Sequence, residues 1–238
     1  MLIAGRHDGH VLPLEPRRRS ALRAASVALA VAWLTAVCVI ALARARTGLP
    51  DAAALASSPR GVMHGEVWTL LTSGLVIAGP PASELAGTAL VVAGVLQALG
   101  GPKFWAVALS GHVGATLVAY AGIGVLAGAG WSGVDGVLDA PDYGISAVWA
   151  ACIGALVAAA ARRRGRRGLA ASLLATAGLA VFAVVIGQPW SLAGVEHVLA
   201  FVLGAAVVAV ADSRGARAAV LRGSRPQAVE AAAGRWDP

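Results

Sequence analysis

Charge is scarce in this sequence. Only 13% of its 238 residues are Asp, Glu, Lys or Arg, whereas 58% are hydrophobic, and the mean hydropathy is +0.75. Soluble domains carry about 25% charged residues. The composition therefore excludes an ordinary soluble domain and places the chain among the polytopic membrane proteins, with the lipid bilayer as its surroundings.

Cysteine is rarer still, with two residues, and the histidines are scattered. Cys38 and Cys152 both lie within apolar runs, where they are typical of small core residues, and they give no disulfide framework. His7, His10 and His64 are too far apart in sequence for a metal site, and no Cys/His cluster is present. The sequence gives no sign of a metal or any other cofactor.

Acidic residues are the less common charged type, twelve against nineteen basic ones, which leaves a net charge of +7. A basic balance can indicate nucleic-acid binding. In a membrane chain, basic loops that face the cytoplasm explain it more simply. We therefore do not expect nucleic acid as a partner.

Long apolar stretches are what the sequence does contain, and they predict an all-α bundle of six transmembrane helices. Each stretch approaches the roughly 20 residues that a bilayer span needs, although the second is short. The predicted spans are about Ala21–Ala43, Glu84–Leu99, Phe104–Leu126, Gly144–Ala161, Gly168–Ile186 and Ser191–Ala211. They define a membrane domain over residues 21–211, between basic tails at 1–20 and 212–238. The tail after Asp212 is polar, and we expect it to be partly disordered.

The basic residues orient this arrangement. With the N-terminus inside, only Arg44, Arg46 and Arg60 of the nineteen basic residues lie on the outer side. This positive-inside bias predicts a multi-pass protein of the cell membrane with both ends in the cytoplasm. A seventh span would place the C-terminal arginines outside, so we interpret Gly65–Gly79, "GEVWTLLTSGLVIAG", as a non-spanning interfacial or re-entrant segment.

Two polar residues enter their spans from the outer side at similar depth. Ser146 lies near the start of the fourth predicted span, and His197 lies about two turns into the sixth. At a rise of ~1.5 Å per residue the two side chains reach comparable depth. Ionisable groups within spans are costly and usually face the protein interior, so His197 is a candidate functional residue.

Helical spacing strengthens this pairing. Small residues follow Ser146 at Ala150 and Gly154, and follow His197 at Ala200 and Gly204. Small-residue faces let two membrane helices approach closely. If these faces meet, the imidazole comes within hydrogen-bonding reach of the hydroxyl, which is the minimum for acyl transfer by a serine nucleophile and a histidine base. The backbone N–H of Ser146, near a helix start, would contribute to an oxyanion site.

Neighbouring polar groups receive simpler interpretations. Most serines in membrane helices bond a backbone carbonyl or permit packing, so the serine alone carries little information. We expect Glu196 either to reach the outer surface or to bond a loop. His112 is predicted to lie in the inner half of the third span, too deep for Ser146, where it makes a structural hydrogen bond.

The order of these elements resembles the rhomboid family of intramembrane serine proteases, over about Ala21 to Ala211. Gly144-Ile145-Ser146-Ala147 is similar to the family's Gly-x-Ser-Gly motif. His197 and the small residues after it resemble the sixth-span pattern, and "GEVWTLLTSGL" resembles a Trp-Arg-Leu-Leu-Thr stretch of the outer first loop, with Thr69 in place of arginine. The resemblance implies that Ser146 is the nucleophile and His197 the general base, acting on transmembrane segments of other membrane proteins.

The chain also departs from the family pattern. Many rhomboids carry His-x-x-x-Asn in the second span to help hold the oxyanion, and by position Glu84 and Thr88 occupy that place here. Ala147 replaces the glycine after the serine. A non-catalytic rhomboid-like protein that binds or routes other membrane proteins is therefore the alternative hypothesis. A transporter is a weaker one, because we find no charged or broken helix at the midplane.

Overall fold

The computed structural model describes residues 16–162 and 191–223. Within these ranges the regular secondary structure is helical, and no strand is present. Four helices have the length and apolar composition to cross a membrane, over Ser20–Thr47, Pro81–Leu99, Gly101–Gly128 and Leu192–Ala211. The predicted fourth span corresponds to a shorter apolar helix at Ile145–Ala161. The predicted fifth span, Gly168–Ile186, lies outside the described residues.

The described residues form long helices that are joined by short ones. The long helices are α1 (Pro16–Thr47), α5 (Pro81–Leu99), α6 (Gly101–Leu109), α7 (Ala115–Gly128), α9 (Ile145–Ala161) and α11 (Leu192–Gly223). The short helices are α2 (Ala52–Leu55), α3 (Pro59–Met63), α4 (Thr69–Thr72) and α8 (Asp135–Leu138). A π-helical turn at Ser110–Gly114 joins α6 to α7, and 3-10 turns lie at Ser73–Leu75 and Ser132–Val134.

Two helices extend beyond the predicted spans. Helix α11 continues past the apolar span Leu192–Ala211 to Gly223, so the first part of the predicted C-terminal tail is helical. Alanine and arginine, which dominate this extension, are strong helix formers in water as well as in lipid. Helix α5 begins at Pro81 rather than at Glu84, because proline suits the first helical turn.

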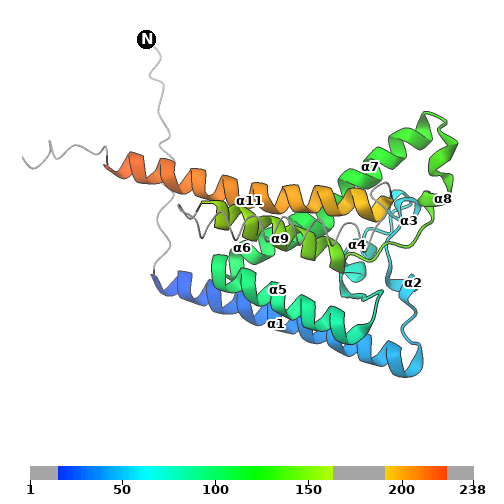
Figure 1. Ribbon diagram of the computed structural model, residues 1–238, viewed down its shortest axis with the longest axis horizontal. Coiled ribbons are helices and arrows are strands. Elements are labelled where there is room, and N and C mark those ends of the chain that lie inside the picture. The colour runs from blue at the N-terminus through cyan, green and yellow to red at the C-terminus, as the bar shows by residue number, and fades with distance from the viewer. Residues whose placement is uncertain (1–15, 163–190, 224–238) are drawn as a thin grey trace, which may run out of the picture.

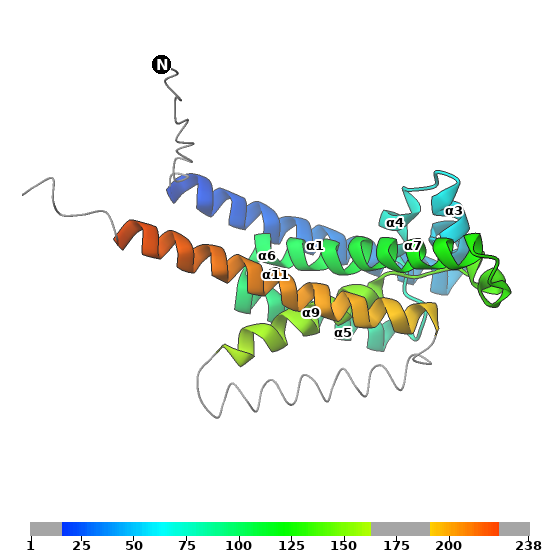
Figure 2. The ribbon, with the colours of Figure 1, turned by 90° about the horizontal axis from the view of Figure 1, so that it is seen from above.

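The long helices lie side by side along the long axis of the molecule (Figure 1). The short helices α2, α3, α4 and α8 gather at one end of the bundle, where α7 ends. The start of α1 and the end of α11 both lie at the opposite end, and the second view shows the same arrangement (Figure 2). Helices α9 and α11 pack against each other more extensively than any other pair in the described part of the chain.

The close packing of α9 against α11 depends on two glycines. A Cβ added to Gly154 would lie 2.9 Å from the carbonyl carbon of Phe201, and one added to Gly204 would lie 2.6 Å from that of Ala151. Each helix thus offers a glycine to the backbone of the other. Ala150 and Ala200, on the predicted small-residue faces, are fully buried. The two predicted faces therefore meet in the fold.

The segment between α1 and α5, which the sequence places on the outer side, does not cross the bundle as a helix. Within Gly65–Gly79 the only helices are α4, of four residues, and a 3-10 turn of three, both too short to span a bilayer. Trp68 and Leu71 expose about 60% and 63% of their surface, whereas Ser73 and Val76 are fully buried. One side of this segment therefore packs on the bundle and the other is open and apolar, as expected for a non-spanning interfacial element.

Candidate functional site

The structure brings Ser146 and His197 together. The Nε2 atom of His197 lies 2.9 Å from the Oγ atom of Ser146, across the interface of α9 and α11. His197 is buried, whereas Ser146 keeps part of its surface open. A base within hydrogen-bonding distance of an accessible hydroxyl is the geometry that acyl transfer needs.

Ser146 occupies the second position of α9, where helical geometry leaves backbone donors free. The first N–H groups of a helix have no partner within the helix. The N–H groups of Ala147 and Val148 both bond to the carbonyl of Gly144, whereas no bond to the N–H of Ser146 is formed within the described residues. That N–H remains available to stabilise a developing oxyanion, as the sequence predicted.

The hydroxyl hydrogen of Ser146 has two acceptors within reach. Besides the imidazole nitrogen at 2.9 Å, the carbonyl oxygen of Tyr143 lies 3.4 Å from Oγ. The shorter contact favours a hydrogen bond from the hydroxyl to Nε2 of His197. In that tautomer Nε2 is the acceptor, which is the protonation state that a general base requires.

The segment before Ser146 is held by the segment between α1 and α5. Ser57 and Asp142 exchange two backbone hydrogen bonds, from Ser57 N to Asp142 O at 3.1 Å and from Asp142 N to Ser57 O at 2.8 Å. The N–H of Gly144 donates to the carbonyl of Ser73 at 3.2 Å. Three backbone bonds therefore fix where α9 begins, and with it the position of Ser146.

His112 lies closer to the site than the sequence predicted. Its imidazole packs on the backbone of Gly144, where a Cβ would overlap the ring, and its Nε2 lies 3.4 Å from the Oγ of Ser73. The predicted separation of His112 from the start of the fourth predicted span was wrong. The segment around Ser73 and Gly74 packs against the middle of the third predicted span, which a count along one helix does not reveal.

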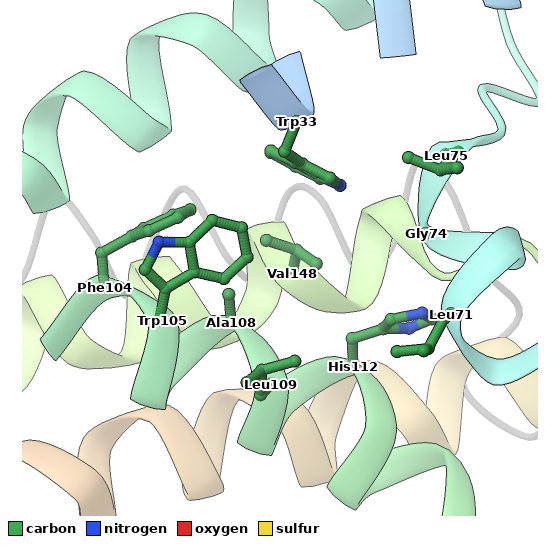
Figure 3. A pocket seen from close by; sticks show the side chains of 10 residues that line it. All are labelled: Trp33, Leu71, Gly74, Leu75, Phe104, Trp105, Ala108, Leu109, His112 and Val148. Carbon is green, nitrogen blue, oxygen red and sulfur yellow. The ribbon is translucent and has the colours of Figure 1, made fainter. Parts of the chain in front are cut away.

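An apolar cavity of about 280 Å³ lies beside His112, between α1, α4, α6 and α9. Figure 3 shows His112 at its edge, next to Leu71 and Gly74, with Trp33 and Trp105 on the other side. Ser146 is not among the residues that line this cavity. The cavity is therefore separate from the Ser146–His197 pair.

Helix α5 contributes no free donor at the place expected for the family's oxyanion residues. The hydroxyl of Thr88 donates to the carbonyl of Glu84 at 2.7 Å and accepts the indole N–H of Trp149 at 2.9 Å. Its single hydrogen is thus already used. The carboxyl group of Glu84 packs against Gly79, at the start of the helix. Neither residue replaces the missing donors, so Ser146 N–H is the candidate that remains.

A buried polar cluster lies next to Ser146 and His197, which are together called the dyad below. The residue at the centre of the cluster, Asp142, was not predicted from the sequence. Asp142 Oδ2 accepts hydrogen bonds from Tyr120 at 3.1 Å and from Ser57 at 3.4 Å. The carboxyl group of Glu196 lies next to that of Asp142 in this cluster. Burial raises the pKa of Asp142 above its usual range, in spite of the hydroxyl groups that donate to it.

Glu196 was predicted either to reach the outer surface or to bond a loop, and the structure agrees with the second. Its carboxyl group meets a loop, at Asp142, and the side chain does not reach the surface of the bundle, because it is only 2% exposed. The sequence signal that could have pointed to the cluster was available. Asp142 lies four residues before Ser146, and Glu196 lies directly before His197.

No protein-family model, no curated protein and no solved structure matches this chain. The function of the protein is therefore inferred from the geometry described above.

Proposed function

We propose that this protein is an intramembrane serine protease that cleaves transmembrane segments of other membrane proteins, in a rhomboid-like bundle of six spans with both termini in the cytoplasm. The observation that carries the proposal is the 2.9 Å contact between Ser146 Oγ and His197 Nε2. It joins a partly open hydroxyl to a buried imidazole within an apolar helical bundle, where an ionisable group is costly and is a functional hypothesis by default.

The reaction follows from the positions of these groups. Nε2 of His197 takes the hydroxyl proton as Ser146 Oγ bonds to the scissile carbonyl carbon. The carbonyl oxygen becomes negative and is met by the N–H of Ser146. The C–N bond then breaks, and the imidazolium gives its proton to the leaving amine. Water, activated by the same imidazole, hydrolyses the resulting ester and restores the hydroxyl.

The occupied donors on α5 favour a slow enzyme. Removing one oxyanion donor costs about 10²–10³ in rate without abolishing the chemistry. This same observation favours the second candidate function, a non-catalytic protein that binds or routes membrane proteins by their spans. The two functions differ in whether the hydroxyl of Ser146 is reactive.

Labelling with a fluorophosphonate probe tests that difference directly. The protein is purified in detergent, and the wild type is compared with Ser146→Ala and His197→Ala. We expect the wild type to label and both variants to lose labelling, because the probe reacts with a serine that a base has activated. A matched control is Ser83→Ala, which removes an exposed serine at the start of α5 and should leave labelling unchanged.

The outcomes separate the two functions. Labelling that disappears in Ser146→Ala and His197→Ala but persists in Ser83→Ala supports the protease. A folded wild type that does not label favours the non-catalytic binder. Labelling that survives in Ser146→Ala assigns the reactivity to another residue and contradicts the proposed site.

A further inference from the structure

The buried carboxyl groups of Asp142 and Glu196 face each other across the two parts of the chain that carry Ser146 and His197. Asp142 lies in the loop directly before α9, four residues ahead of Ser146, and Glu196 lies on α11 directly before His197. The carboxyl groups contact each other, and both side chains are buried, at 7% and 2% exposure. They form the polar bridge between the loop and the helix at the level of the dyad.

A bridge between two carboxyl groups requires a proton. Two ionised carboxylates side by side in a buried site repel each other and accept hydrogen bonds without donating any, so one of them must stay protonated. Asp142 Oδ2 already accepts from the hydroxyl groups of Tyr120 and Ser57. Glu196 Oε1 has no hydrogen-bond partner in the described part of the chain. Glu196 is therefore the better holder of the shared proton, which it donates to Asp142.

We propose that Asp142 and Glu196 are positioning residues that share one proton and thereby hold the start of α9 against α11, with Ser146 facing His197. The inference rests on the proposed function for its effect on catalysis, but the bridge itself does not. Asp142 is also tied through its backbone to Ser57, so the bridge connects the outer segment, the start of α9 and α11 in one unit.

Other groups face the pair and must be distinguished from it. Tyr120 faces it from α7, and His112 from the π-helical turn. Ser57 and Thr116 are the neutral neighbours, from the outer segment and from α7. Loss of the shared proton at alkaline pH would place two negative charges together and separate the loop from the helix. Ionisation of Tyr120 is the competing source of an alkaline effect.

The test compares a variant that keeps the bridge with one that removes it. Glu196→Gln replaces the shared proton with an amide N–H that does not titrate, and the carboxylate of Asp142 then accepts from that amide and from two hydroxyl groups. Glu196→Met has a similar volume but no donor. The thermal unfolding midpoint and the rate of fluorophosphonate labelling are measured for each, between about pH 6 and about pH 10.

The proposal predicts how the unfolding midpoint and the labelling rate of each variant change with pH. For the wild type, the midpoint and the labelling rate both fall at alkaline pH, the rate by about tenfold or more. Glu196→Gln keeps both near their neutral values across the range. Glu196→Met labels about tenfold more slowly than the wild type at neutral pH, and its midpoint shows no comparable alkaline fall. Tyr120→Phe retains the alkaline fall, because the shared proton remains.

The same measurements show what would overturn the proposal. It fails if the profiles of Glu196→Gln and the wild type coincide, if Glu196→Met labels as fast as the wild type, or if Tyr120→Phe abolishes the alkaline fall. A wild type that never labels defeats the proposed function alone. In that case the bridge is judged from the unfolding midpoints, which must still fall with pH in the wild type and not in Glu196→Gln.

Discussion

The crossing of α9 and α11 sets the distance between the two dyad residues, so Gly204→Ala should disturb the site from a distance. The added Cβ would lie 2.6 Å from the carbonyl carbon of Ala151 and closer still to its oxygen. Carbon atoms pack at about 3.5–4.0 Å, so the helices must move apart by roughly 1 Å at this point. The opposing atoms belong to a helix backbone and cannot rotate away as a side chain would.

The size of the effect follows from this displacement. Overpacking of a close contact costs about 1–3 kcal/mol of unfolding free energy. His197 lies seven residues before Gly204 on the same helix, about 10 Å away along the axis, so a rigid helix carries part of the shift to the dyad. The 2.9 Å contact then lengthens beyond good hydrogen-bonding distance. A misplacement of about 1 Å can lower a rate by about 10²-fold, which is the fall in labelling rate that we predict.

The assay needs a control that adds the same atom without the clash. Gly122→Ala on α7 does so, because nothing lies within 4 Å of the Cβ it would add. Both variants gain the same helix propensity, up to about 1 kcal/mol. We expect Gly122→Ala to label and unfold like the wild type or to be slightly more stable. The reasoning is refuted if Gly204→Ala equals Gly122→Ala in both labelling rate and unfolding midpoint, because the helices would then adapt without separating.

Three further outcomes are expected. Thr88→Val should lower stability by about 1 kcal/mol through loss of the hydrogen bond to Trp149, yet leave the labelling rate within about twofold; a hundredfold fall would instead make Thr88 an oxyanion donor. Arg60→Ala should change the unfolding midpoint very little, because its ion pair with Asp139 is exposed and such pairs contribute about 0–1 kcal/mol; a larger loss would show that the pair secures the outer segment. Phe104→Ala should cost about 3–5 kcal/mol, since its ring is fully buried among other aromatic rings, and an unfolding midpoint close to that of the wild type would contradict this packing.

Stability should also depend on pH through Asp142. Burial raises the pKa of Asp142 in the folded protein, and Asp142 shares one proton with Glu196, so the folded pair retains a proton that the two carboxyl groups of the unfolded chain release at lower pH. The stability from this group is fully present below the unfolded value of about 3.9 and is lost as pH rises through the raised folded value. The free energy of unfolding should therefore fall as pH rises. A surface carboxylate in a salt bridge has the opposite effect, because its pKa is lowered in the folded protein.

Much of the fold was readable from the sequence, because a membrane span is a local property. About 20 apolar residues in a row form a helix in lipid whatever else the chain contains. The predicted spans in the described residues correspond to α1, α5, α6 with α7, α9 and α11, with shifts at the ends of α5 and α11. Depth along a helix is local as well, so Ser146 and His197 were placed at matching depth before any contact was known.

What the sequence left open depends on how the helices face one another and on where the segment between α1 and α5 packs. Three contacts between distant elements show this. His112 packs on Gly144, Thr88 is hydrogen-bonded to Trp149, and Asp142 meets Glu196. Helical periodicity gives the face of each residue on its own helix but not the partner that the face will meet. The sequence alone determined the apolar helical class, and it predicted that the two candidate residues lie at matching depth. Only the tertiary structure decided that they touch and that two buried carboxyl groups bridge the segments that carry them.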